Sequence, residues 1–99
     1  PEGDVAQKFD KNVRSRTHET DVATSTTAGI ATAASTDRIA VMFQNKDASI
    51  TIYLGNSDVA STKGIALVAG ASFMDDRSST VWYARSASGT PSLGVTVFY

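Results

Sequence analysis

The chain has 99 residues, one histidine and no cysteine, and its formal net charge at pH 7 is −1. A chain of this length has room for one domain, and its near-neutral charge supplies no overall basic field to capture nucleic acid or an anionic membrane. A single histidine cannot build a metal site alone, and no stretch approaches the roughly 20 apolar residues of a membrane span, so we expect no metal or other cofactor, no nucleic acid and no membrane as partners.

The apolar residues predict a thin core. Fourteen of the 41 hydrophobic residues are alanine, which leaves 27 larger side chains. Each of these contributes roughly 1.5–3 kcal/mol when fully buried, whereas ordering the backbone costs about 1–2 kcal/mol per residue. Small chains gain further stability from disulfides, metals or association. Only association remains here, so we expect an oligomer or a subunit of a larger assembly.

Residues 1–21 are predicted to form a charged N-terminal arm. They hold nine of the chain's 19 charged residues and only four hydrophobic ones. Such a segment cannot bury enough apolar surface to fold alone. The predicted organisation is therefore an arm over 1–21 followed by one domain over 22–99.

The arm contains one helical pattern. Val5, Phe9 and Val13 are spaced i, i+4, i+8, which places them on one stripe of a helix. Asp4 occupies the N-cap position and Gln7 the matching capping-box position. A helix this short is unstable alone in water, so one hypothesis is that the stripe orders against a partner. Chance spacing in a disordered arm is the alternative, and the sequence leaves both open.

The rest of the chain has the periodicity of strands. The stretch 22–36 is uncharged and rich in β-branched residues, which predicts an edge strand near 22–27 and a crossing segment towards residue 38. Apolar and polar residues then alternate in short segments separated by turn signals, near 39–44, 50–54, 65–68, 71–74, 81–85 and 93–99. No helical pattern provides parallel crossovers. We therefore predict an all-β fold, an antiparallel β-sandwich with Greek-key or jelly-roll-like connections and an extended N-terminal arm.

Catalytic combinations are absent from the sequence. His18 is the only histidine and falls in the predicted arm, so it gives no Ser–His–Asp arrangement. Asp75 and Asp76 are adjacent carboxylates in a predicted turn, which favours a solvated tip over a calcium site with its six or more oxygen ligands. Gly64 and Gly70 end strands and precede no helix, so they form no phosphate loop. We expect a protein that is not an enzyme.

Five aromatic residues of the predicted domain are candidates for an oligomer interface or a sugar-stacking platform: Tyr53, Trp82, Tyr83, Phe98 and Tyr99. Successive side chains of a strand point to opposite faces. We predict that Val81 and Tyr83 point into the core. Trp82 then points outward, which makes Tyr53 and Trp82 the candidate interface aromatics.

Several short segments follow one another in a characteristic order and spacing over residues 36–99. These segments are Asp37-Arg38, Gln44-Asn45, Ile52-Tyr53-Leu54-Gly55, Asp58-Val59, Gly64-Ile65-Ala66-Leu67, Ala69-Gly70-Ala71-Ser72-Phe73, Val81-Trp82-Tyr83-Ala84 and Ser86-Ala87-Ser88-Gly89-Thr90. Their order and spacing resemble those of small structural accessory proteins of tailed bacteriophages, which include capsid decoration (cement) and head-fibre proteins.

The resemblance implies a homo-oligomeric β-sandwich on a virion surface, a trimer or alternatively a dimer, anchored by an N-terminal segment. The expected function is a capsid cement subunit, assembled in the host cytoplasm, whose partner is the major capsid protein or a neighbouring virion subunit. The alternative is a head-fibre or tail-associated module that binds host surface or carbohydrate. A charged arm with an apolar stripe favours the cement function, because Val5, Phe9 and Val13 could then contact the neighbouring subunit.

Overall fold

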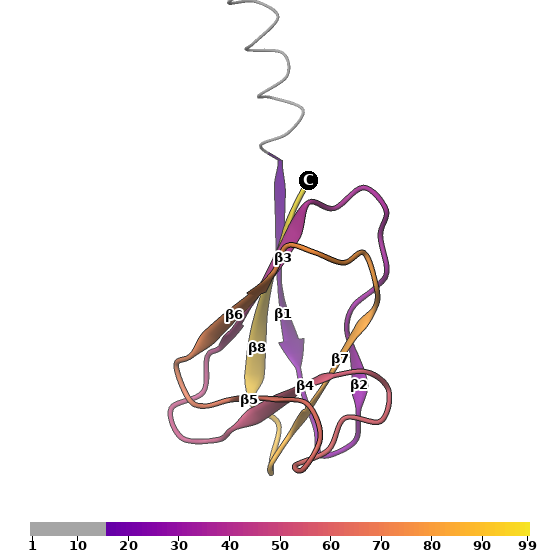
Figure 1. The fold of residues 1–99 in the computed structure, drawn as a ribbon. Coiled ribbons are helices and arrows are strands. Elements are labelled where there is room, and N and C mark those ends of the chain that lie inside the picture. Colours follow the sequence, from indigo (N-terminus) through magenta and orange to yellow (C-terminus); the bar gives the residue numbers. More distant parts are fainter. Residues whose placement is uncertain (1–15) are drawn as a thin grey trace, which may run out of the picture.

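The computed structural model describes residues 16–99, which form eight β-strands and no helix. The strands are β1 (Thr17–Ala23), β2 (Gly29–Thr32), β3 (Ala40–Asn45), β4 (Ile52–Gly55), β5 (Ile65–Leu67), β6 (Ser72–Asp75), β7 (Trp82–Ser86) and β8 (Ser92–Phe98). They form two four-stranded sheets (Figure 1). The predicted all-β class is confirmed.

Sheet A has the strand order β1-β8-β3-β6, and sheet B has the order β2-β7-β4-β5. Every neighbouring pair is antiparallel, as predicted from the lack of helical crossovers. β1 and β8 pair without a register shift from Thr17↔Phe98 to Ala23↔Ser92. β2 is irregular, because its register with β7 shifts between Ile30 and Thr32.

The inner faces of the two sheets share one hydrophobic core, which the predicted alternation located. Sheet A contributes Val41, Phe43, Leu93, Val95 and Val97. Sheet B contributes Ala31, Ile52, Leu54, Leu67 and Ala84. Each strand places every second residue on this face. The outer face of sheet A carries mainly polar residues, such as Glu19, Gln44 and Thr96.

Asn45 joins the two sheets at the end of β3. Its side chain is fully buried, and Nδ2 donates hydrogen bonds of 2.8 Å to the carbonyl oxygens of Ile50 and Leu67. Its Oδ1 accepts a hydrogen bond from the backbone N–H of Asp47. All polar atoms of the amide are therefore paired, which is the condition for burying such a group without a large cost.

β1 begins at Thr17, inside the range predicted to be an arm, and ends at Ala23 instead of continuing to residue 27. The boundary predicted at residue 21 therefore falls within a strand. The reason is that β1 is an edge strand whose residues are almost all exposed, so its polar composition resembles that of an unfolded segment. The remainder of the predicted arm, with Val5, Phe9 and Val13, lies outside the described residues.

The predicted orientation of β7 is wrong. Trp82 points inward and packs against Phe43 and Phe73, with ring centroids 5.6 and 5.7 Å apart. Tyr83 therefore points to the outer face of sheet B. The predicted alternation of side chains along β7 was correct, but the wrong set was assigned to the inner face. Trp82 points inward because the inner face provides both aromatic contacts and an acceptor for the indole N–H.

Candidate functional site

A buried polar cluster holds together two segments that cross between the sheets, 33–39 and 76–81. The side chain of Arg38 is completely buried, and its guanidinium donates hydrogen bonds to the carbonyl oxygens of Ala33 (3.0 Å), Ser78 (3.2 Å) and Thr80 (2.6 Å). The Asp75 carboxylate lies 3.9 Å from the same guanidinium. The cluster thus closes this end of the core.

Asp75 is 8% exposed, so the predicted solvated tip is wrong for this residue. Its carboxylate accepts hydrogen bonds from the Ser78 hydroxyl (2.5 Å), the Arg77 amide (2.9 Å) and the Trp82 indole (2.8 Å). Burial raises the pKa of Asp75, but these hydrogen bonds lower it more, so that its pKa falls to about 2. The adjacent Asp76 is exposed, as predicted.

A perturbed pKa is a common sign of a functional site, but structural networks produce it as well. The hydrogen bonds of Asp75 come from Arg77, Ser78 and Trp82, all near it in the chain. They hold the turn after β6 and orient the indole. We therefore assign the cluster a structural role.

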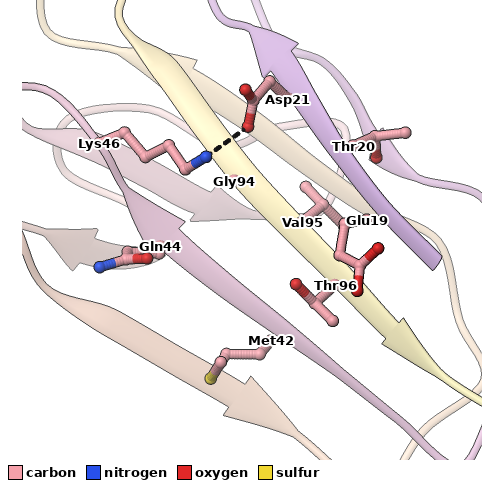
Figure 2. Close-up of a pocket in the computed structure, with 9 residues that line it drawn as sticks. All are labelled: Glu19, Thr20, Asp21, Met42, Gln44, Lys46, Gly94, Val95 and Thr96. Carbon is pink, nitrogen blue, oxygen red and sulfur yellow. Dashed lines mark hydrogen bonds and ion pairs between the residues drawn. The ribbon is translucent and has the colours of Figure 1, made fainter. Parts of the chain in front are cut away.

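The surface feature that joins several charged side chains is a shallow groove of about 320 Å³ on the outer face of sheet A (Figure 2). It is lined by Glu19, Thr20, Asp21, Met42, Gln44, Lys46, Gly94, Val95 and Thr96. These residues come from β1, β8 and β3, with Lys46 directly after β3. The groove therefore runs across three adjacent strands.

Gly94 leaves room for the Lys46 side chain to cross this groove. The Lys46 side chain extends over β8 and its Nζ lies 2.8 Å from Asp21 Oδ1 (Figure 2). A Cβ added at Gly94 would lie 2.9 Å from Lys46 Cε, which is too close without movement of the lysine. The glycine thus lets an ion pair connect edge strand β1 to the far side of β8.

β1 presents an unpaired backbone edge. The Tyr99 N–H donates to the Arg16 carbonyl (2.8 Å), and the Thr24 N–H donates to the Pro91 carbonyl (3.0 Å). Hydrogen-bonded pairs alternate along an antiparallel ladder, so the even-numbered residues of β1 bond to β8. The N–H and C=O groups of Thr17, Glu19, Asp21 and Ala23 therefore point away from the sheet, and no other described strand pairs with them.

The outer face of sheet B carries the aromatic side chains. Tyr53 lies opposite Arg85 and Tyr83 lies opposite Gly55 in the β4–β7 register. Both tyrosines are half-buried, and Ile30, opposite Tyr83 on β2, is 56% exposed. This group of Ile30, Tyr53, Tyr83 and Arg85, the sheet B patch, combines one aliphatic and two aromatic side chains with one cation.

The structure places the two candidate interface aromatics on different faces. Tyr53 lies on the outer face in the sheet B patch, whereas Trp82 belongs mainly to the core. An interface role for Trp82 stays a prediction, and it would involve only the part of the indole that faces the solvent.

Sequence reasoning missed the groove residues Glu19, Asp21 and Lys46. The available signal was the strand propensity of Thr17, Thr20 and Val22 around Glu19 and Asp21, but the charge density of the arm obscured it.

Within residues 16–99, no group of three or more His, Cys, Asp or Glu side chains is arranged to hold a metal ion. The same part of the chain has no helix of the length and apolarity needed to span a membrane. Comparisons of the chain with protein-family models, curated proteins and solved structures find no match.

Proposed function

We propose that this chain is a virion structural protein, a decoration or cement subunit that binds an assembled phage head through its N-terminal segment and the adjoining face of sheet A. The observation that carries the proposal is the strand order. The orders β1-β8-β3-β6 and β2-β7-β4-β5 match those of an eight-stranded jelly roll, in which consecutive strands mostly alternate between two packed sheets. Jelly rolls are frequent in viral shell proteins.

The connection between the N-terminal segment and the domain supports a tether. The segment leads directly into β1, and all seven β1 residues pair with β8. A pull along β1 loads these backbone contacts together, parallel to the strands, instead of separating them one after another. The Lys46–Asp21 ion pair adds a lateral contact over the same strands. β1 therefore suits a strand that transmits force from the particle to the domain.

A second function has its own support in the sheet B patch. Tyr53 and Tyr83 are half-buried on the same face as Arg85, and tyrosine rings that reach the solvent can stack against sugars. Jelly rolls also occur in lectins, so the fold alone does not separate the two functions. A host- or carbohydrate-binding module of a head fibre or tail is accordingly the alternative.

Particles assembled without the protein and then supplemented with it provide the test. We expect the wild-type chain to raise the temperature at which particles break, and a Phe9→Ser/Val13→Ser variant to bind more weakly while its domain stays folded. Tyr53→Ser/Tyr83→Ser is the matched control and should stabilise particles as the wild type does. If supplemented and depleted particles break alike, and only the tyrosine variant loses host adsorption, the binding-module function replaces the cement function.

A further inference from the structure

We propose that the unpaired edge of β1 binds an extended segment of a partner protein that carries Lys or Arg at alternate positions, which adds a strand to sheet A. This inference deepens the proposed function, because it specifies the chemistry of the segment that the partner supplies. It rests on the backbone, the side chains and the charges of β1.

The four edge strands differ in how they are protected. β2, β5 and β6 have four, three and four residues, and β2 also contains the irregularity at Ala31. β1 has seven residues in a continuous register and contains neither proline nor lysine. Short length, bulges, proline and charged side chains, lysine above all, are the usual means of blocking an edge. Of these, β1 has only the acidic Glu19 and Asp21, which oppose an acidic strand and not a basic one.

Among residues 16–99, no strand pairs with the outer edge of β1 at any position along its length. Thr17, Glu19, Asp21 and Ala23 direct their N–H and C=O groups away from β8, as the flanking hydrogen bonds at Arg16 and Thr24 establish. At about 3.4 Å per residue, the edge is about 20 Å long. Strand addition draws its affinity from such main-chain groups and its specificity from alternate side chains.

The alternate side chains on the outer face are acidic. Glu19 and Asp21 are both exposed beside the groove of Figure 2. Asp21 Oδ1 contacts Lys46, and Glu19 has no basic side chain within ion-pair distance among the described residues. A basic residue placed opposite each carboxylate forms a favourable cross-strand pair. Charge complementarity thus selects Lys or Arg at every second position of the incoming strand.

The opposite side of β1 accepts small polar residues. His18 and Thr20 share the face of Val97 and Val95 but are exposed, so sheet B does not cover them. The other alternate positions of the incoming strand therefore meet polar neighbours and water at this end. Threonine suits these positions, because it combines high strand propensity with a polar group.

The same charges oppose pairing of β1 with a second copy of itself. An antiparallel pair centred on Glu19 or on Asp21 places that carboxylate opposite its own copy. A pair centred on Thr20 places Glu19 opposite Asp21 twice. Like charges directly opposite one another destabilise a sheet, so the edge discriminates against its own copy and in favour of a basic strand.

The test uses the complete chain with a capped heptapeptide that alternates threonine and lysine. We expect the backbone amides of Glu19 and Asp21, which exchange rapidly when unpaired, to exchange at least about tenfold more slowly with the peptide bound. A peptide with glutamate in place of lysine should bind about tenfold more weakly. Glu19→Lys/Asp21→Lys should reverse that preference. Alternate N-methylation of the lysine peptide should abolish protection.

Glu19→Pro separates backbone pairing from simple charge attraction. It removes one N–H from the free edge and none from the β8 ladder, a position where strands tolerate proline. Glu19→Gln, the matched control, removes the charge and keeps the N–H. We expect Glu19→Pro to abolish protection and Glu19→Gln to weaken binding severalfold.

Three results would overturn the proposal: unchanged exchange at Glu19 and Asp21, equal binding of the N-methylated peptide, or concentration-dependent protection of β1 in the chain alone, which would assign the edge to a second copy. The peptide assay needs no particle. A chain that binds the peptide but does not attach to particles therefore contradicts the proposed function only, and the reverse result contradicts this inference only.

Discussion

The two edges of sheet A are held in different ways. β6 is short, and its inward residues Phe73 and Asp75 contact Trp82 of the other sheet. β1 is longer, and only Val22 packs against the core, so it depends mainly on its hydrogen bonds to β8. An edge strand can therefore be built into the core by its side chains or attached by its backbone. The second kind leaves its side chains free for a partner.

The largest effect is expected when the carboxylate at the β6 edge is removed. Asp75→Ala should lower the free energy of unfolding by about 3 kcal/mol, because Arg38 stays buried without its carboxylate and the Trp82 N–H loses its acceptor. Urea denaturation measures this change. Asp76→Ala, at the exposed neighbour, should stay within about 0.5 kcal/mol. Similar values for the two variants would show that the cluster does not hold β6.

Proline substitutions test whether β1 depends on its backbone. Thr20→Pro removes an N–H from the β8 ladder and should destabilise the domain by about 2 kcal/mol. Glu19→Pro, one residue earlier, removes only an N–H that faces away from the sheet and should cost less than about 1 kcal/mol. Thermal unfolding of both variants gives the comparison. If Glu19→Pro were the more damaging variant, the assignment of the free edge would be inverted.

Acid should weaken the attachment of the β6 edge, which depends on the Asp75 carboxylate. The pKa of Asp75 is about 2 in the folded chain, against an ordinary value of 3.8. Because its folded pKa is depressed, Asp75 contributes stability that is present above about pH 4 and is lost as the pH falls through about 2. Denaturation curves recorded from pH 5 to pH 2 should therefore fall more steeply for the wild type than for Asp75→Ala. A residual slope is expected from Asp47, whose pKa is lowered by the backbone N–H groups of Ser49 and Ile50. Identical slopes for the two proteins would contradict the assignment.

The smallest effect concerns the ion pair across Gly94. Lys46 and Asp21 are both substantially exposed, so Lys46→Ala should lower stability by at most about 0.5 kcal/mol. The loss should shrink at high salt, because exposed charges are screened. Denaturation at low and high ionic strength is the measurement, with Lys63→Ala as the control. A loss of several kcal/mol would mean that β1 is held by side chains after all.

Much of the fold was readable from the alternation of apolar residues. Val41 and Phe43, Ile52 and Leu54, and Leu93, Val95 and Val97 are apolar residues of the predicted alternating segments, and all of them lie on the inner faces. A period of two buried on one side is a local property of the chain. The predicted strand near 22–27 was misplaced, because the residues that form β1 are exposed on both faces and carry no such pattern.

The candidate site was less accessible from the sequence. Glu19, Asp21 and Lys46 meet only because β1 and β3 flank β8, which brings together residues 25 positions apart. Tyr53 was identified as a surface aromatic and does lie on an outer face. Trp82 was assigned to the wrong side, because alternation gives the period of β7 but does not say which phase faces the core.

The all-β class, the antiparallel pairing and most of the core followed from the amino-acid sequence, because these depend on local periodicity and turn residues. The strand order, the inward orientation of Trp82, the burial of Asp75 and the free edge of β1 depend on how the strands pack together. Burial of a polar or aromatic group requires partners that other parts of the chain supply. Asp75 looks like a solvated carboxylate until Arg38, which is distant in the chain, lies beside it, and β1 looks like an unfolded arm until β8 lies beside it.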